Sequence, residues 1–187
     1  MNKPDLKKVI ILSSPSGGGK NTLINALLKI NTQVEHSIST TTRQPRYDEV
    51  QGNPYYFIRV EEFETMIHER RFLEWAPVLN NYYGTTHSEI DRILKNGHIA
   101  ILDIDIQGAL QIKRLHPEVT TVFIEPPSLE ILGERLRRRG TETDEQITER
   151  LTLANEEMKH KAAYDYTIVN DTVQKALVEL QNIIHKL

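Results

Sequence analysis

The sequence predicts an α/β fold, in which helices cover both faces of a parallel β-sheet. Four short, apolar runs rich in β-branched residues recur along the chain, and amphipathic helical patterns separate or follow them. Near-continuous apolar strands that alternate with helices are typical of a parallel sheet buried on both faces. The expected strands are residues 9–12, 99–106, 119–124 and 167–169, and the expected helices are residues 22–29, 107–115, 129–139 and 172–185.

A glycine-rich loop joins the first expected strand to the first expected helix. Strand, glycine-rich turn and helix, in that order, are the context in which such a loop holds phosphate. Backbone N–H groups and the helix N-terminus would face the anion, and Lys20 would add a full positive charge. The residues expected to contact a nucleotide phosphate here are Ser14, Pro15, Ser16, Gly17, Gly18, Gly19, Lys20, Asn21 and Thr22.

The loop departs from the usual pattern at two positions. Ser14 stands where the pattern begins with Gly, and Asn21 replaces the Ser or Thr whose hydroxyl binds Mg²⁺. Mg²⁺ demands near-ideal geometry and tolerates substitution poorly. Three arrangements stay open: the Asn21 amide binds the metal directly, water fills the gap, or Thr22 shifts inward. We expect weakened but real metal binding.

Composition limits the function classes. The 187 residues suit one domain with inserted lobes, and the net charge of -3 gives no reason to expect nucleic-acid binding. No apolar run approaches the roughly 20 residues that span a bilayer, and the N-terminus is polar, so we expect a cytoplasmic protein that binds no membrane. The absence of cysteine fits a reducing compartment. The seven histidines show no paired metal spacing and are interpreted as surface or structural residues.

Two segments interrupt the strand–helix alternation. Residues from about 36 to 86 are polar and rich in Thr, Tyr and Arg, which indicates a small, mainly β lobe with one helix near residues 61–70. Residues 135–150 are highly charged, and Thr143 or Asp144 would begin a second helix there. A glycine-hinged, arginine-rich helical pair beside a phosphate loop suggests a lid.

Two aspartates close the expected strand that ends in Leu102-Asp103-Ile104-Asp105. The carboxyl edge of a parallel sheet faces the same crevice as the phosphate loop. Asp103 could therefore hold Mg²⁺ through water or orient Lys20. The alternative is that the aspartates only cap the next helix.

Arg43 and Arg46 lie three residues apart on a turn that Pro45 stiffens. Two guanidinium groups that converge on one point bind a dianionic phosphate well. Tyr55 and Tyr83 could donate hydroxyls to the same oxygens. The alternative is a solvated turn with surface arginines.

Glu74 occupies an apolar setting, and a buried carboxylate needs hydrogen-bond donors. Guanine offers two on one edge, N1–H and the N2 amine, whereas adenine presents an acceptor at N1. Hydroxyls of Ser39 and Thr85 could complete recognition, and the wrong base would leave the charge unpaired. The alternative is that Glu74 is a surface residue of a strand.

Together these segments resemble the guanylate kinase family over about residues 8–185. The matching motifs, in chain order, are STTTRQPR (39–46), FLEWA (72–76), NYYGT (81–85), ILDIDIQG (101–108), RGTE (139–142) and IVND (168–171). The resemblance implies a nucleotide-binding core with a P-loop (residues 1–35, 87–127 and 158–187), a GMP-binding lobe (36–86) and a helical lid (128–157).

The resemblance also implies transfer of the γ-phosphoryl group of ATP to GMP, with Mg²⁺ as cofactor and no covalent catalysis. By motif position, the implied catalytic residues are Lys20, Arg43, Asp103, Arg139 and Arg150. ATP would contact the loop residues Ser14 to Thr22 together with Arg139 and Asn170. GMP would contact Ser39, Arg43, Arg46, Tyr55, Glu74, Tyr83, Thr85, Asp103, Asp105 and Arg150, and the metal would involve Asn21 and, through water, Asp103.

Two alternatives stay open. Because Asn21 replaces the metal-binding hydroxyl, the chain could be a related domain that has lost catalysis and binds a partner. It could also be a small-molecule kinase for another sugar phosphate, although Glu74 with Ser39 and Thr85 favours guanine. ATP and GMP are the expected partners of a monomer or homodimer.

Overall fold

A computed structural model describes residues 6–140 and 142–187 and contains two five-stranded sheets. Residues 1–5 and Thr141, which the sequence analysis places in the core and the lid, lie outside the described residues. The first sheet is parallel throughout, in the order β10-β9-β1-β8-β2. Its strands are β1 (Val9–Ser13), β2 (Val34–His36), β8 (Ile99–Asp103), β9 (Thr120–Glu125) and β10 (Tyr166–Val169).

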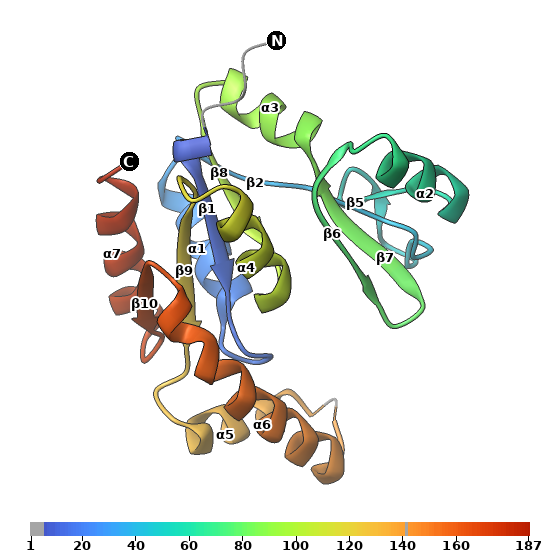
Figure 1. Cartoon of the computed structure of the whole chain (residues 1–187). Coiled ribbons are helices and arrows are strands. Elements are labelled where there is room, and N and C mark those ends of the chain that lie inside the picture. The colour runs from blue at the N-terminus through green and yellow to red at the C-terminus, as the bar shows by residue number, and fades with distance from the viewer. Residues whose placement is uncertain (1–5, 141) are drawn as a thin grey trace.

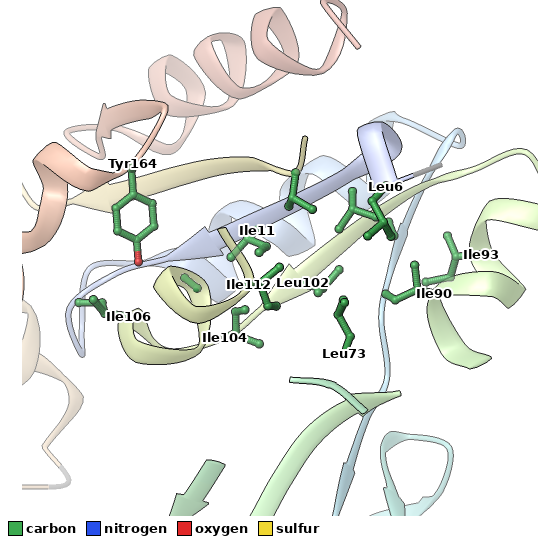
Figure 2. Close-up of a cluster of buried hydrophobic side chains, with 14 of the residues drawn as sticks. Leu6, Ile11, Leu73, Ile90, Ile93, Leu102, Ile104, Ile106, Ile112 and Tyr164 are labelled. Atoms are coloured by element: carbon green, nitrogen blue, oxygen red, sulfur yellow. The ribbon is translucent and has the colours of Figure 1, made fainter. Parts of the chain in front are cut away.

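Helices cover both faces of this sheet (Figure 1). α1 (Lys20–Ile30) and α7 (Val173–Ile184) pack on one face, where Leu23, Leu27 and Leu180 join Ile10 and Ile101 in one buried cluster. α3 (His87–Lys95) and α4 (Ile106–Leu115) pack on the other. The buried residues on this second face form one cluster, which extends from Ile90 and Ile93 of α3 to Tyr164 (Figure 2). A short 3-10 turn, η1 (Leu6–Lys8), precedes β1.

The second sheet forms a separate lobe, seen beside the core in Figure 1. Its strand order is β4-β5-β3-β7-β6, and one helix, α2 (Val60–His68), covers it. Phe63 of α2 stacks on Phe72 and Tyr82, with ring centroids 4.3 and 5.3 Å apart. The strands are β3 (Ser39–Thr41), β4 (Val50–Gln51), β5 (Pro54–Phe57), β6 (Phe72–Val78) and β7 (Asn81–Thr86).

A helical pair at the phosphate-loop end of the core completes the fold (Figure 1). α5 (Leu129–Arg139) ends at Gly140, whose φ of 67° is a left-handed conformation that favours glycine. α6 (Asp144–Met158) begins at Thr143, which forms a capping box with Gln146. The pair packs through its own small apolar cluster, and η2 (Lys159–Ala163) leads from it back to β10.

One buried carboxylate ties together the two points where the chain crosses between core and lobe. Glu89, in the first turn of α3, accepts a hydrogen bond from the backbone N–H of Ile38 at 2.9 Å, where the chain enters the lobe. Glu89 also binds the guanidinium of Arg92 at 2.8 and 2.9 Å. Arg92 in turn reaches Glu35 on β2 at 2.6 Å. The entry and exit of the lobe are therefore joined by ionic contacts.

The structure corrects four details of the sequence prediction. The core sheet has a fifth strand, β2, because Val34–His36 is too short and too polar to stand out as an apolar run. Helix α3 was not predicted as an element. The strand expected at residues 99–106 ends at Asp103, and Ile106 already belongs to α4. The alternation of Ser37 and Ser39 with Ile38 predicts a half-buried strand from Ser37, but the strand begins at Ser39. No helix in the described part of the chain is long and apolar enough to cross a membrane.

Candidate active site

The glycine-rich loop between β1 and α1 wraps tightly. Gly17 and Gly19 have φ angles of 89° and 91°, which side chains rarely adopt, and the Gly18 N–H donates to the Pro15 carbonyl at 2.9 Å. A Cβ on Gly17 would lie 2.8 Å from Leu132 Cδ1 of α5. The loop is therefore in direct contact with the helical pair, and glycine is required there for space as well as conformation.

Asn170 follows β10 and contacts the same loop from the core side. Its side chain is 3 % exposed, and its amide donates to the Gly18 carbonyl at 2.8 Å. A Cβ on Gly19 would collide with that amide. Arg135 of α5 donates to the Asn170 carbonyl at 2.7 Å. Asn170 thus fixes the loop from the core side, a contact that its position in the sequence does not reveal.

Two cavities flank the loop. One of ≈ 400 Å³ lies between the loop, α5 and the start of α7, and another of ≈ 260 Å³ lies on the loop itself. Arg139 lines both, whereas Asn170 lines only the larger. The first cavity also includes Arg135 and Arg138. An open space lined by loop backbone and three arginines suits a polyphosphate.

Lys20 and Asp103 meet at the carboxyl edge of the core sheet. The Lys20 ammonium forms an ion pair with Asp103 Oδ1 and donates to the Ile104 carbonyl at 3.4 Å. Asp105 instead caps α4, because its carboxylate accepts the Gly108 N–H at 2.7 Å. The sequence left open whether both strand-end aspartates cap the next helix. In the structure Asp105 does so and Asp103 pairs with Lys20.

The residues proposed for Mg²⁺ fit an oxygen-binding cation. Asn21 and Asp103, which carry an amide oxygen and a carboxylate, line one cavity of ≈ 360 Å³. Oxygen ligands are what Mg²⁺ prefers, and it usually keeps several waters and substrate oxygens besides. Among the described residues, no group of three His, Cys, Asp or Glu side chains is arranged to hold a metal. The cation would therefore depend on few protein ligands.

A histidine that the sequence analysis left among the surface or structural residues lies in this cavity. His36, at the end of β2, lines it together with Asn21 and Asp103. Burial lowers the pKa of His36, and the Lys20 charge lowers it further while the Asp103 charge opposes the change. No sequence motif marks His36, because its position depends on β2, which the sequence did not predict.

The expected arginine clamp is held by a carboxylate that sequence reasoning missed. Both terminal nitrogens of Arg43 contact Glu49, each at 2.9 Å, and the Arg46 N–H donates to Glu49 at 2.8 Å. This pairing raises the pKa of Arg43 and lowers that of Glu49. Glu49 therefore orients the turn. Arg46 contacts this carboxylate through its backbone N–H and not, among the described contacts, through its guanidinium.

Aromatic residues surround Arg43. Its guanidinium lies 5.4 Å from the centroid of the Tyr55 ring, and Tyr55 packs edge-on against Tyr83 at 5.8 Å. Tyr55 pairs with Ser39 in the register of β3 and β5. The structure therefore brings these four predicted acceptor-site residues together on one part of the lobe sheet.

Glu74 is buried, not a surface residue: it is 6 % exposed on β6. Burial raises its pKa to about 7, and the nearby Asp105 charge adds to the effect. A Cβ on Gly108 would lie 3.5 Å from Glu74 Oε2 and 3.2 Å from Asp105 Oδ1, so both carboxylates adjoin the same helix turn. The Thr85 hydroxyl is also buried, with no hydrogen-bond partner among the described residues. Hydrogen bonding from Thr85 opposes the effect of burial on the pKa of Glu74 but does not cancel it, so a ligand edge could supply further donors.

The helical pair reaches the phosphate loop through Arg150. Its guanidinium donates to the Ser16 hydroxyl and pairs with Glu142 at 3.3 Å. Arg139 and Arg150 therefore both adjoin the loop, from α5 and α6 respectively. Near this region, buried oxygens of Glu157 and Tyr164 have no hydrogen-bond partner in the described chain. Neither residue lies in a motif that the sequence analysis used.

The comparisons with known proteins agree on one family. A sequence model of the family described as guanylate kinase matches residues 6–187. The chain belongs to the guanylate kinase family. Guanylate kinase from Idiomarina loihiensis is 48 % identical over 183 residues, covering 97 % of this chain and 87 % of that protein. Guanylate kinase from Desulfitobacterium hafniense is 45 % identical over 176 residues, covering 94 % and 88 %.

A solved structure gives the same result. The crystal structure of guanylate kinase from Anaplasma phagocytophilum matches with a TM-score of 0.72 and 33 % identity, covering 95 % of this chain and 84 % of that one. Membership of the guanylate kinase family confirms the predicted α/β fold with its P-loop core. The comparisons do not support the alternative of a binding module that has lost catalysis.

Proposed function

We propose that this guanylate kinase family member transfers the γ-phosphoryl group of ATP to GMP, and also to dGMP, to give ADP and the nucleoside diphosphate. The observation that carries the proposal is the arrangement around the core sheet edge. A phosphate loop with Lys20 lies at that edge, and the buried carboxylate of Glu74 lies beside Gly108 of α4. Family membership supports the same reaction.

In the proposed reaction, a phosphate oxygen of GMP attacks the γ-phosphorus of ATP, and the bond to the bridging oxygen of ADP breaks. Such a reaction needs positioning and charge neutralisation more than covalent help. Lys20 and the loop N–H groups would hold the ATP phosphates, with Arg139 and Arg150 reaching them from the helical pair. Asn21, and Asp103 through water, would hold Mg²⁺, which would supply positive charge to offset the negative charge of the ATP phosphates.

The acceptor would lie in the lobe. Arg43, Arg46, Tyr55 and Tyr83 are proposed to bind the GMP phosphate, and the packing of Arg43 against Tyr55 supports this for the pair. Glu74 would accept N1–H and the N2 amine of guanine, assisted by Ser39, Thr85 and Asp105. Asn170 is proposed to lie next to the adenine of ATP. Its position in the wall of the larger cavity supports this proposal.

We also propose the three-part division given above: core 1–35, 87–127 and 158–187, GMP-binding lobe 36–86 and lid 128–157. The separate second sheet and the separate apolar cluster of α5 and α6 support it. The proposal includes a cytoplasmic location and a monomer or homodimer.

A coupled assay of ADP formation from ATP and Mg²⁺ tests the function, with GMP, dGMP, AMP, UMP or no acceptor. We expect turnover with GMP and dGMP only. Equal rates with UMP or AMP would instead support the kinase of another sugar phosphate. ADP formation that does not depend on any acceptor would refute nucleoside monophosphate transfer.

A further inference from the structure

The cavity beside the phosphate loop has a composition that Mg²⁺ chemistry alone does not explain. Its polar lining includes Asn21 at the start of α1, His36 at the end of β2 and Asp103 at the end of β8. An imidazole is a poor ligand for Mg²⁺, whose usual ligands are oxygens, but a good one for first-row transition ions.

Strand geometry places His36 and Asp103 on the same face of the core sheet. Val34 and Ile101 both belong to the buried cluster under α1 and α7, so they face that side. Side chains two residues apart on a strand share a face, which directs His36 and Asp103 to the α1 side as well. β2 and β8 are neighbours, and His36 pairs with Ile101 in the register. The charges of both Asp103 and Lys20 act on the imidazole.

Among the described residues, two of these three side chains have no hydrogen-bond partner in the protein, and the third is paired through one oxygen only. Within the described part of the chain, neither the Asn21 amide nor the His36 imidazole makes a hydrogen bond to another residue. Asp103 makes its ion pair with Lys20 through Oδ1, which leaves Oδ2 of the same carboxylate. Residues that carry an amide oxygen, an imidazole nitrogen and a carboxylate oxygen thus line one cavity of ≈ 360 Å³.

We propose that Asn21, His36 and Asp103 form a divalent-cation site that binds first-row transition ions such as Mn²⁺ in preference to Mg²⁺. The nitrogen ligand sets the preference, since imidazole binds first-row transition ions better than Mg²⁺, and Mn²⁺, the lowest of these ions in the Irving–Williams order, is the most demanding probe. Three protein ligands leave further positions for water. His36 then supplies a ligand in the cavity where Asn21 stands in place of a hydroxyl.

The test measures metal binding to the whole protein without nucleotide, so its outcome does not depend on the proposed function. The six-line electron paramagnetic resonance signal of free Mn²⁺ disappears on binding and gives the dissociation constant, and Mg²⁺ is then added as a competitor. We expect Mn²⁺ to bind at least about tenfold more tightly than Mg²⁺. His36→Ala should weaken Mn²⁺ binding about tenfold or more and change Mg²⁺ binding less than about twofold.

His98→Ala is the matched control, because His98 pairs with Glu35 at 3.0 Å and does not line this cavity. It should bind Mn²⁺ as the wild type does. Equal affinities of the wild type for Mn²⁺ and Mg²⁺, or wild-type Mn²⁺ binding by a folded His36→Ala, would overturn the proposal.

A second measurement needs no destabilising variant. The chain has seven histidines, whose imidazole protons can be followed by nuclear magnetic resonance. Substoichiometric Mn²⁺ should broaden the resonances of His36 far more than those of the other six. His36→Gln, a more conservative change, assigns the resonance. Uniform broadening of all seven imidazoles, or broadening that leaves His36 unaffected, would contradict the proposal.

Discussion

Replacing Glu74 with Gln removes a buried ionisable group and keeps the size of the side chain. In the folded protein, burial raises the pKa of Glu74 from 4.5 to about 7. The fold therefore favours the protonated carboxyl, and the unfolded chain loses its proton at lower pH. The stabilising contribution is complete below the unfolded pKa and is lost as the pH rises through about 7.

The magnitude follows from the two pKa values. One pKa unit corresponds to about 1.4 kcal/mol, so ionisation of Glu74 should cost the fold about 3 kcal/mol by pH 8 and below about 1 kcal/mol at pH 5. Gln cannot ionise and avoids this cost. The free energy of unfolding of Glu74→Gln, relative to the wild type, should therefore rise by about 2–3 kcal/mol between pH 5 and pH 8.

Urea denaturation followed by circular dichroism, at both pH values and without nucleotide, measures this difference. Glu64→Gln is the control, since Glu64 is an exposed carboxylate on α2 of the same lobe. The free energy of unfolding of Glu64→Gln, relative to the wild type, should be the same at both pH values. The same Glu74→Gln variant should raise KM for GMP by about two orders of magnitude, because hydrogen bonds to a charged acceptor are lost. Parallel pH dependence of wild type and Glu74→Gln would refute the reasoning.

Two further predictions concern the phosphate loop. Asn21→Ser should lower the Mg²⁺ concentration for half-maximal rate and leave KM for GMP little changed, because it restores a hydroxyl; an unchanged Mg²⁺ titration would contradict this. In Asn170→Ala the Gly18 carbonyl loses its amide donor. This variant should raise KM for ATP and leave KM for GMP within about twofold. Its free energy of unfolding, from urea denaturation, should fall by about 1 kcal/mol. Equal effects on both substrates would contradict a role confined to the loop.

Features that depend on local pattern could be predicted from the sequence. Strand β1, helix α5 and the start of α6 at Thr143 follow from apolar runs, helical spacing and capping residues, which act over a few neighbours. The family motifs also mark the candidate site residues, because these motifs are local in sequence. The burial of Glu74 agrees with its apolar setting in the sequence.

Features that depend on distant pairing could not be predicted. β2 is a strand because β8 pairs with it, and its three residues carry no pattern of their own. Glu49 holds Arg43 because a turn brings it back, and Asn170 holds Gly18 across 152 positions of sequence. Side chains of this kind are found only once the strand order is known.

Glu89 has a consequence for how the lobe can move. The chain leaves the core near Ile38 and returns at α3, and the Glu89 carboxylate fastens the first crossing to the second at 2.9 Å. The lobe also contacts the core through Leu73 of β6, which belongs to the same buried cluster as residues of α3 and α4. A change in the angle between the two sheets would therefore have to shift Leu73 within this cluster as well as turn the backbone on either side of Glu89.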